Sequence, residues 1–280
     1  ATMNAICMIG KKVCYCDTLK SSPNLCLESL EDRLIRNNSI STILIPNLWS
    51  TLNELDDLKI LSNKYNVNLI YDSSQAFSCS YNGKKISTNG NAEVFSFHAT
   101  KLITAFEGGC ITTNNRYLYE KLAHIRSNYG LVGNSFWPKK ASNACMSELQ
   151  AGICLKSLAN IKNSIEHNKK IFNLYKKYLK PVNRFKIFDP SSSKIESSYQ
   201  YMVLILDQNV MEVRDKFKEH LTNLNILARS YFDYDFSIFN DENPFDFPNS
   251  INLSKSSICL PIGQRISYQD VAYISETINN

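Results

Sequence analysis

The stretch STILIPNLWSTLNELDDLKILSNKYNVNLIYD, residues 41–72, decides the fold class of this chain. It opens with a short apolar run at 41–46 and closes with a second such run at 67–71, and each run predicts a buried strand. Between them, at 53–65, apolar residues recur every three or four positions, which predicts a helix with Asn53 as its N-cap. A strand, a helix and a strand in this order predict a parallel sheet covered by helices, and therefore an α/β fold.

The alternation continues on both sides of this stretch. Further strands are predicted at 12–16, 92–97, 110–113 and 199–207. Further helices are predicted at 25–36, about 115–128, about 146–158, about 161–179, 210–222 and 268–278. The predicted loops are 129–143 and the irregular stretch 230–257, and Pro181 ends the long helix. After the long helix the strand–helix alternation gives way to a strand, a helix and irregular chain. We therefore place a domain boundary near the start of that helix, with a large domain over residues 1–160 and a small α+β C-terminal domain over 161–280.

Composition and charge narrow the class of protein. A chain of 280 residues with 44% hydrophobic and 20% charged residues is long and apolar enough to fold around a large core. The 31 Lys and Arg residues exceed the 26 Asp and Glu residues by five but are scattered, so we expect no nucleic-acid partner. No apolar run approaches the ~18 residues of a membrane span, and no signal peptide is visible. These features favour a cytoplasmic protein with no membrane partner.

The nine cysteines do not have the spacing of a metal site. Cys14 and Cys16 lack a second pair at zinc-finger spacing, and the chain has only four histidines. Most of the cysteines stand in apolar surroundings, so we expect buried thiols in a reducing compartment and no metal.

Polar side chains of four kinds stand around two neighbouring predicted strand ends. Asp72 and Gln75 follow the strand at 67–71, and Ser96 and Lys101 stand at and beyond the end of the strand at 92–97. A pyridoxal-phosphate enzyme needs an amine, a carboxylate for the pyridine nitrogen, a polar group beside the ring hydroxyl and hydroxyls for the phosphate. By themselves the same residue types also fit a solvent-facing lysine and an aspartate that forms a turn.

The sequence motifs that contain these residues are more specific than the residue types alone. The phrases YDSSQAF (71–77), FSFHATK (95–101) and EGGCITTN (107–114) resemble, in order and spacing, those of the DegT/DnrJ/StrS family of sugar aminotransferases. The likeness is greatest to members that form dTDP-4-amino-4,6-dideoxyhexoses. It extends over nearly the whole chain through ATMNAICMI (1–9), NACMSELQAG (143–152), ILARSYF (226–232) and ICLPIG (258–263).

The resemblance implies a pyridoxal-phosphate-dependent transferase of fold type I, similar to aspartate aminotransferase. Its cofactor would be pyridoxal 5′-phosphate, with Lys101 as the Schiff-base lysine. Asp72 would contact the pyridine nitrogen, Gln75 the 3-hydroxyl side of the ring and Ser96 the phosphate. Asn143 would reach the phosphate of the partner subunit, because these enzymes share their active sites across a homodimer.

Each of two further residues has two possible roles. His98 would lie near the substrate or serve as a structural histidine that orients the loop. Arg229 matches the start of a small-domain phrase of the family, and it would lie near the substrate or be a surface arginine. Glu107 is assigned no proton-transfer role.

The resemblance also implies the reaction, with one alternative. The chain would transfer an amino group from glutamate to a nucleotide-linked keto-6-deoxyhexose, for O-antigen or another surface polysaccharide. In the family roughly fifty residues precede the position of Ala1, and they include a helix N-terminus that binds the cofactor phosphate and an aromatic residue that stacks on the ring. The alternative is therefore a truncated, non-catalytic remnant that retains the fold, dimerisation or nucleotide-sugar binding.

Overall fold

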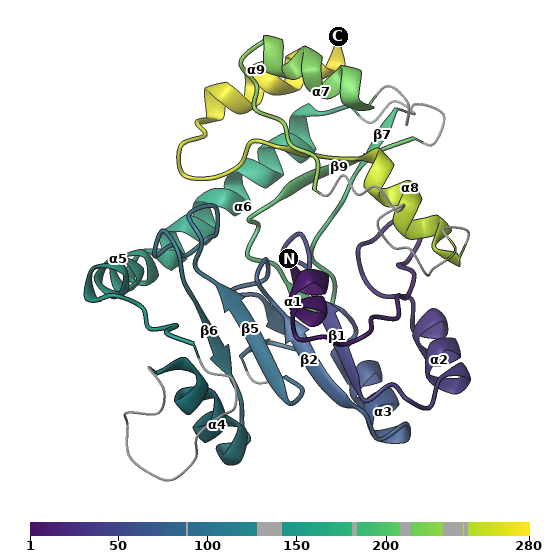
Figure 1. Cartoon of the computed structure of the whole chain (residues 1–280). Coiled ribbons are helices and arrows are strands. Elements are labelled where there is room, and N and C mark those ends of the chain that lie inside the picture. The colour runs from purple at the N-terminus through teal and green to yellow at the C-terminus, as the bar shows by residue number, and fades with distance from the viewer. Residues whose placement is uncertain (88, 128–141, 181–183, 208–213, 232–242, 244–245) are drawn as a thin grey trace.

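The structure is a computed structural model of the whole chain (Figure 1), and it describes residues 1–87, 89–127, 142–180, 184–207, 214–231, 243 and 246–280. Within these residues a main sheet, a smaller antiparallel sheet and a short third sheet are surrounded by helices.

The main sheet has the strand order β1-β2-β5-β6. Its strands are β1 (Thr42–Pro46), β2 (Asn68–Asp72), β5 (Ala92–Ser96) and β6 (Gly109–Thr112). The first three strands run parallel and β6 is antiparallel to β5, so the expected α/β fold with a mainly parallel sheet is confirmed. Because β1, β2 and β5 are parallel, their carboxyl ends meet at one edge.

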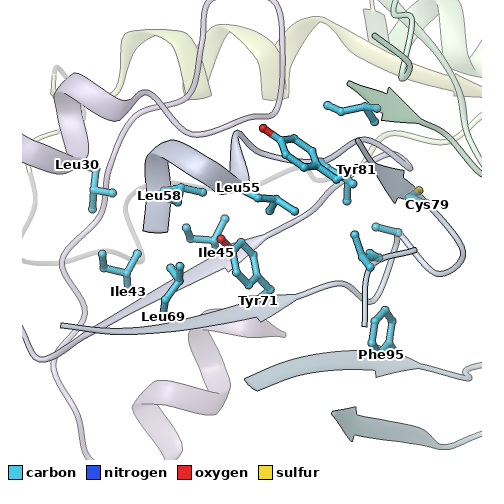
Figure 2. Packing of buried hydrophobic residues seen from close by; sticks show 14 of the residues in the cluster. Leu30, Ile43, Ile45, Leu55, Leu58, Leu69, Tyr71, Cys79, Tyr81 and Phe95 are labelled. Carbon is cyan, nitrogen blue, oxygen red and sulfur yellow. The ribbon is translucent and has the colours of Figure 1, made fainter. Parts of the chain in front are cut away.

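One face of this sheet carries the larger hydrophobic core. The helices α2 (Leu27–Arg36) and α3 (Leu55–Lys64) pack Leu30, Leu34 and Leu58 against Ile45 and Tyr71 of the strands (Figure 2). In β1 and β2 every second residue is buried, which is the period of a strand with one face on a core.

The second sheet has the order β10-β9-β7 and is antiparallel throughout. Its strands are β7 (Phe185–Ile187), β9 (Met202–Leu206) and β10 (Ser257–Leu260). The helices that contribute to its core are α6 (Ile161–Tyr178), α7 (Arg214–Asn223) and α9 (Tyr268–Asn279). A separate cluster that includes Trp49, Tyr201 and Leu253 joins this sheet to the loop after β1.

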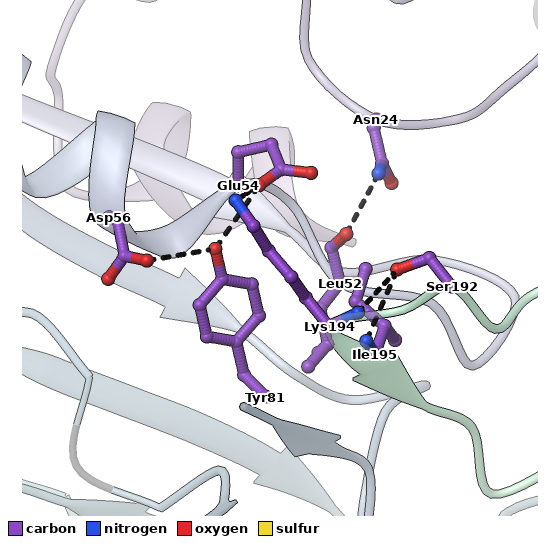
Figure 3. Close-up of polar contacts among 8 residues, drawn as sticks. All are labelled: Asn24, Leu52, Glu54, Asp56, Tyr81, Ser192, Lys194 and Ile195. Atoms are coloured by element: carbon purple, nitrogen blue, oxygen red, sulfur yellow. Dashed lines mark hydrogen bonds and ion pairs between the residues drawn. The ribbon is translucent and has the colours of Figure 1, made fainter. Parts of the chain in front are cut away.

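The third sheet ties a segment between β7 and β9 to the first core. It pairs β3 (Ser80–Tyr81) with β4 (Lys84–Lys85) and β8 (Ile195–Glu196). Beside it, the Lys194 ammonium lies 3.1 Å from a Glu54 carboxylate oxygen, and the Tyr81 hydroxyl lies 3.1 Å and 3.2 Å from carboxylate oxygens of Glu54 and Asp56, either of which can accept its proton (Figure 3).

Four further helices complete the description. They are α1 (Thr2–Met8), α4 (Arg116–Arg126), α5 (Glu148–Ala159) and α8 (Pro248–Ser256). Figure 1 shows α1 in front of the main sheet and α8 beside the segment that leads to α2. No helix in the described ranges is long and apolar enough to cross a membrane.

Three sequence predictions about elements are wrong. Residues 12–16 form no strand, and the β-bridge in this part of the chain joins Thr18 to Leu25. Asn53 does not cap α3: the N-cap is Glu54, and the Asn53 amide donates to Asn47 and to the carbonyl of Pro46. The stretch 230–257 is not irregular throughout, since it contains α8 and the start of β10.

The cysteine prediction also needs correction. Of the nine, all in described segments, only Cys79 and Cys259 are buried, and none forms a disulfide. No group of three or more His, Cys, Asp or Glu side chains that could hold a metal ion occurs among the described residues.

Candidate functional site

The candidate site lies at the carboxyl edge formed by β1, β2 and β5. Asp72 ends β2 and is in register with Pro46 of β1 and Val94 of β5. Ser96 ends β5, and Lys101 follows in the loop before β6. Parallel strands place ligand sites at this edge. The register therefore brings residues from separate parts of the chain to one place.

Both carboxylate oxygens of Asp72 have partners. The Thr2 hydroxyl of α1 donates to Oδ2 at 2.6 Å, and the Ser74 backbone N–H donates to Oδ1 at 3.1 Å. An O–H···O distance of 2.6 Å is typical of a hydrogen bond to a charged carboxylate. These two contacts fix the plane of the carboxyl group at the strand end.

The Lys101 side chain is half-buried near Asp72. Burial lowers the pKa of the Lys101 amine below its usual range, and the Asp72 carboxylate partly offsets this shift by favouring the charged form. A lysine with a lowered pKa has more of the uncharged amine, which is the form that attacks a carbonyl.

Gln75 has a defined orientation. Its side chain is 5% exposed, and its Oε1 accepts a hydrogen bond from the Trp49 backbone N–H at 3.0 Å. Since the amide oxygen is engaged with the loop after β1, the NH₂ group points the other way and can serve as a donor. The Gln75 carbonyl also accepts from both the N–H and the hydroxyl of Ser50.

Ser96 and His98 organise the start of the loop that carries Lys101. The His98 backbone N–H donates to the Ser96 hydroxyl oxygen at 3.3 Å, so this hydroxyl keeps its own proton for another partner. The His98 ring is held inside the loop, with Nδ1 at 2.9 Å from Thr100 Oγ1 and Nε2 at 3.5 Å from a Glu107 carboxylate oxygen.

Asn143 and Arg229 lie apart from this group. Asn143 is exposed, between two residues whose N–H groups bond carbonyls at the end of α4. Arg229 is exposed too; it forms a β-bridge with Cys259, and its guanidinium donates to the Tyr231 hydroxyl at 3.3 Å. Among the hydrogen bonds of the described residues, neither joins the group around Lys101.

Beneath the Asp72 turn lies a buried polar chain that the sequence did not reveal. The Asn47 amide donates to the Ser73 hydroxyl at 3.0 Å, and that hydroxyl donates to the Glu93 carboxylate at 2.5 Å. Burial raises the pKa of the Glu93 carboxyl, and hydrogen bonds from Ser73 and Asn89 oppose the shift. The one available signal was a carboxylate inside the apolar strand AEVFSF.

Sequence reasoning also missed Thr2 and Gln200. Thr2 stands in the phrase ATMNAICMI, which resembled the family, but nothing local indicated its contact with Asp72. The Gln200 side chain donates to the carbonyl of Thr100, next to Lys101, from a segment 100 residues away in sequence that leads into β9. Both contacts arise only when distant segments pack together.

The donor set at this edge fits pyridoxal phosphate. A half-buried amine, a carboxylate held on both oxygens, an oriented amide donor and a hydroxyl with a free proton are the groups that the cofactor's aldehyde, ring nitrogen, ring hydroxyl and phosphate require. Together with the parallel sheet, they define the class of pyridoxal-phosphate-dependent transferases with the fold of aspartate aminotransferase.

Solved structures agree with this fold. A structure of DesI in the presence of its TDP-sugar product superimposes with a TM-score of 0.90 at 24% identity, over 99% of this chain and 70% of that one. Helicobacter pylori PseC, an aminotransferase of pseudaminic acid biosynthesis, superimposes with a TM-score of 0.89 at 23% identity, over 98% of this chain and 75% of that one. The expected fold type is thereby confirmed.

The family follows from sequence. The family model of the DegT/DnrJ/EryC1/StrS aminotransferases matches residues 1–279, and the chain belongs to this family. The expected recognition, the enzyme class of pyridoxal-phosphate-dependent sugar aminotransferases and the cofactor are confirmed.

The sequence identity to individual relatives is low. A UDP-4-amino-4,6-dideoxy-N-acetyl-beta-L-altrosamine transaminase of Campylobacter jejuni is 27% identical over 99% of this chain and 75% of its own length. A dTDP-4-amino-4,6-dideoxy-D-glucose transaminase of Shigella dysenteriae is 30% identical over 78% of this chain and 60% of its own length. A GDP-perosamine synthase of Escherichia coli O157:H7 is 26% identical over the whole chain and 75% of its own length.

Proposed function

We propose that this chain transfers an amino group from glutamate to the keto group of a nucleotide-linked keto-6-deoxyhexose. The observation that carries the proposal is the placement of the half-buried Lys101 amine near the Asp72 carboxylate at the carboxyl edge of the main sheet. The three relatives described above carry the names of enzymes for UDP-, dTDP- and GDP-linked sugars. The first two names specify a 4-amino-4,6-dideoxy sugar on a nucleotide, which supports this substrate class.

Lys101 and Asp72 have complementary roles in this proposal. Pyridoxal phosphate supplies a carbonyl that takes up the amino group and a ring that accepts electrons. Lys101 holds the cofactor through its amine and then moves the proton at the reacting carbon, for which a lowered pKa suits it. Asp72 would pair with the ring nitrogen and keep it protonated, and the hydrogen bonds from Thr2 and Ser74 would hold the carboxylate in place for this contact.

Gln75 and Ser96 would orient the cofactor. The Gln75 NH₂ group, directed away from the Trp49 N–H, is the donor for the ring 3-hydroxyl oxygen. The Ser96 hydroxyl accepts from His98 and therefore donates its own proton to the phosphate.

His98 and Arg229 are the two residues for which a substrate contact was one of two alternatives. Thr100 and Glu107 contact the two ring nitrogens of His98, which supports the structural alternative in which His98 orients the lysine loop. Arg229 remains a proposed substrate contact. Its partner Tyr231 packs edge-on against Tyr201. Tyr201 follows Gln200, whose side chain contacts the loop that carries Lys101.

We also propose a homodimer in which Asn143 reaches the partner's cofactor. Asn143 is exposed in one copy and leads into α5, a helix with no buried residue. One stripe of α5 presents Leu149 (74% exposed), Gly152 and Leu155 (66% exposed) at helical spacing. An apolar helix stripe that stays exposed among the residues that the structure describes fits burial against a second copy.

The proposal includes two domains, residues 1–160 and 161–280, and a cytoplasmic location. The boundary near residue 160 is supported by the two main core clusters, one of which draws mainly on residues 30–105 and the other on 171–278. Ile195 is the exception, since β8 returns to the first core. The amino sugar would serve O-antigen or another surface polysaccharide, built from activated sugars in the cytoplasm.

The test begins with the cofactor. Purified protein mixed with pyridoxal phosphate should absorb in the visible region, and Lys101→Ala should remove that band while the exposed Lys156→Ala keeps it. With glutamate and a panel of UDP-, dTDP- and GDP-linked keto-6-deoxyhexoses, mass spectrometry should detect one amino sugar. A stable, folded protein with no band, or with a band and no product from any sugar, would contradict the proposal and favour the non-catalytic alternative.

A further inference from the structure

Gln200 connects the antiparallel sheet to the loop that carries Lys101. It stands two residues before β9, in the segment that follows β8. Its side-chain NH₂ donates to the Thr100 carbonyl at 3.0 Å and lies 3.4 Å from the Tyr201 hydroxyl. A glutamine amide has two N–H donors, so it can make both contacts.

The contact falls on the peptide unit that joins Thr100 to Lys101. The N–H of that unit, which belongs to Lys101, donates to the His98 carbonyl at 2.9 Å. Its carbonyl, which belongs to Thr100, accepts from Gln200. Because a peptide unit is planar, hydrogen bonds at both its N–H and its C=O fix its rotation, and with it the direction in which the Lys101 side chain leaves the backbone.

The other end of Gln200 is anchored beside Gln75. The Gln200 backbone N–H donates to the Ser50 hydroxyl at 3.1 Å, and that hydroxyl donates to the Gln75 carbonyl at 3.2 Å. Ser50 is fully buried and has a φ of 58°, a conformation in which a non-glycine residue persists only when its surroundings hold it. The Ser197 hydroxyl, which donates to the Ser50 carbonyl at 2.8 Å, is part of those surroundings.

A continuous set of hydrogen bonds therefore links Gln75, Ser50, Gln200 and the Thr100–Lys101 peptide. It joins the residue assigned to the ring hydroxyl to the residue assigned to the amine, and it passes through the start of β9. A shift of β9 relative to the main sheet would change the aim of Lys101 through this set.

We propose that Gln200 is a positioning residue that sets the direction of Lys101 by holding the Thr100–Lys101 peptide from the start of β9. The inference rests on the proposed function, in which Lys101 is the lysine that meets the cofactor. Gln200 acts through the backbone and touches neither Lys101's amine nor the reacting atoms. Its amide NH₂ group, and not its bulk, is the feature that matters.

The test uses two variants of Gln200 and one matched control. Gln200→Met keeps the length of the side chain and removes the donor. Gln200→Glu keeps the size and the backbone bond to Ser50, but its ionised carboxylate cannot donate to the Thr100 carbonyl. Gln264→Met removes an equivalent glutamine donor, whose bond goes to the Ser164 hydroxyl.

The main readout is covalent labelling of Lys101 in the apoprotein. Pyridoxal phosphate is added, the adduct is fixed with borohydride, and the labelled lysine is quantified by peptide mass spectrometry. We expect the labelling rate of Gln200→Met and Gln200→Glu to fall roughly ten- to a hundredfold, since misplacement of a reacting group by about 1 Å has an effect of this size. Gln264→Met should label like the wild type, and thermal unfolding of all folded variants should be similar.

The acidic variant adds a rescue. When the introduced carboxyl is protonated it regains an O–H donor, so the ratio of its labelling rate to that of the wild type should rise as the pH falls toward about 5. If Gln200→Met does not fold, this ratio in Gln200→Glu decides the question.

The outcomes separate the inference from the proposed function. Wild-type labelling in both folded Gln200 variants would overturn the positioning role and leave the proposed function standing. Wild-type protein that is not labelled at Lys101 would overturn the proposed function itself. Equal loss in Gln264→Met would also overturn the positioning role, because the effect would not depend on the Thr100 contact.

Discussion

At the scale of single residues, the proposed site depends on contacts made by side chains that carry no chemistry of their own. Asp72 is the clearest example, because the hydroxyl of Thr2 and the N–H of Ser74 take up both its oxygens. In the proposed function, these contacts would set how the carboxylate meets the ring nitrogen.

Thr2→Val should therefore weaken cofactor binding. The variant keeps the shape of the side chain and loses a hydrogen bond to a charged group, which contributes about 1.5 kcal/mol, or roughly tenfold in Kd. Thr2→Ser should bind like the wild type because it retains the hydroxyl. The Kd of pyridoxal phosphate for each apoprotein, from visible absorbance titration, checks this; equal affinity of the valine and serine variants would show that the contact has no effect.

The Lys101 amine should make stability depend on pH. Burial lowers its pKa in the folded state from the ordinary value of 10.5, so the unfolded chain binds this proton more tightly. The unfavourable contribution is present below the folded pKa and is relieved as the pH rises through it toward 10.5. Lys101→Met should stabilise the apoprotein at neutral pH, with a gain that shrinks as the pH rises toward 10.5.

Urea unfolding across this pH range measures the effect. Lys156→Met, which replaces an exposed lysine, should follow the wild type at every pH. A gain in Lys101→Met that stays constant with pH would mean that the amine is not destabilised by burial.

At the scale of elements, α8 has a tertiary cap. Pro248 occupies the first helical position, and the next two backbone N–H groups, from Asn249 and Ser250, donate to the carboxylate of Asp17 at 3.1 and 2.8 Å. The Asp17 side chain is 5% exposed and lies 231 or more residues away in sequence. A carboxylate at a helix N-terminus is favourable through both hydrogen bonding and the helix dipole.

Asp17→Ala should lower the free energy of unfolding by about 2 kcal/mol, because it leaves the helix N–H groups without their partner. Asp32→Ala removes only the exposed ion pair with Arg36 and should cost less than about 0.5 kcal/mol. Urea unfolding of the two variants gives the comparison. Similar midpoints would show that α8 does not depend on this cap.

The elements differ in how well the sequence predicts them. Helices such as α3 and α6 were predictable because their apolar residues recur at helical spacing over ten or more residues. The two-residue strands β3, β4 and β8 are too short to show such a period. β4 pairs with the adjacent β3, and β8 is defined by its pairing with β3 from a distant part of the chain. The stretch 230–257 was predicted as irregular because its α8 helix is stabilised by Asp17 from outside it.

At the scale of the whole molecule, the exposed stripe of α5 should govern assembly. Leu155→Glu would place a charge in the proposed interface, and we expect the dimer to dissociate and the cofactor contact of Asn143 to be lost. Ile60→Glu changes an equally exposed residue (63%) on α3 and should leave the dimer intact. Analytical ultracentrifugation distinguishes the two, and a dimeric Leu155→Glu variant would place the interface elsewhere.

The sequence by itself determined the α/β class and the family, and it predicted that Asp72, Gln75, Ser96 and Lys101 lie at one edge of the sheet. It could do so because these residues follow strands whose apolar runs are local, and because parallel strands always bring their carboxyl ends to one edge. Only the tertiary structure decided which groups hold them in place. The contacts of Thr2 with Asp72 and of Gln200 with the lysine loop join segments 70 and 100 residues apart, and no local periodicity records a hydrogen bond that forms only after the sheets have packed.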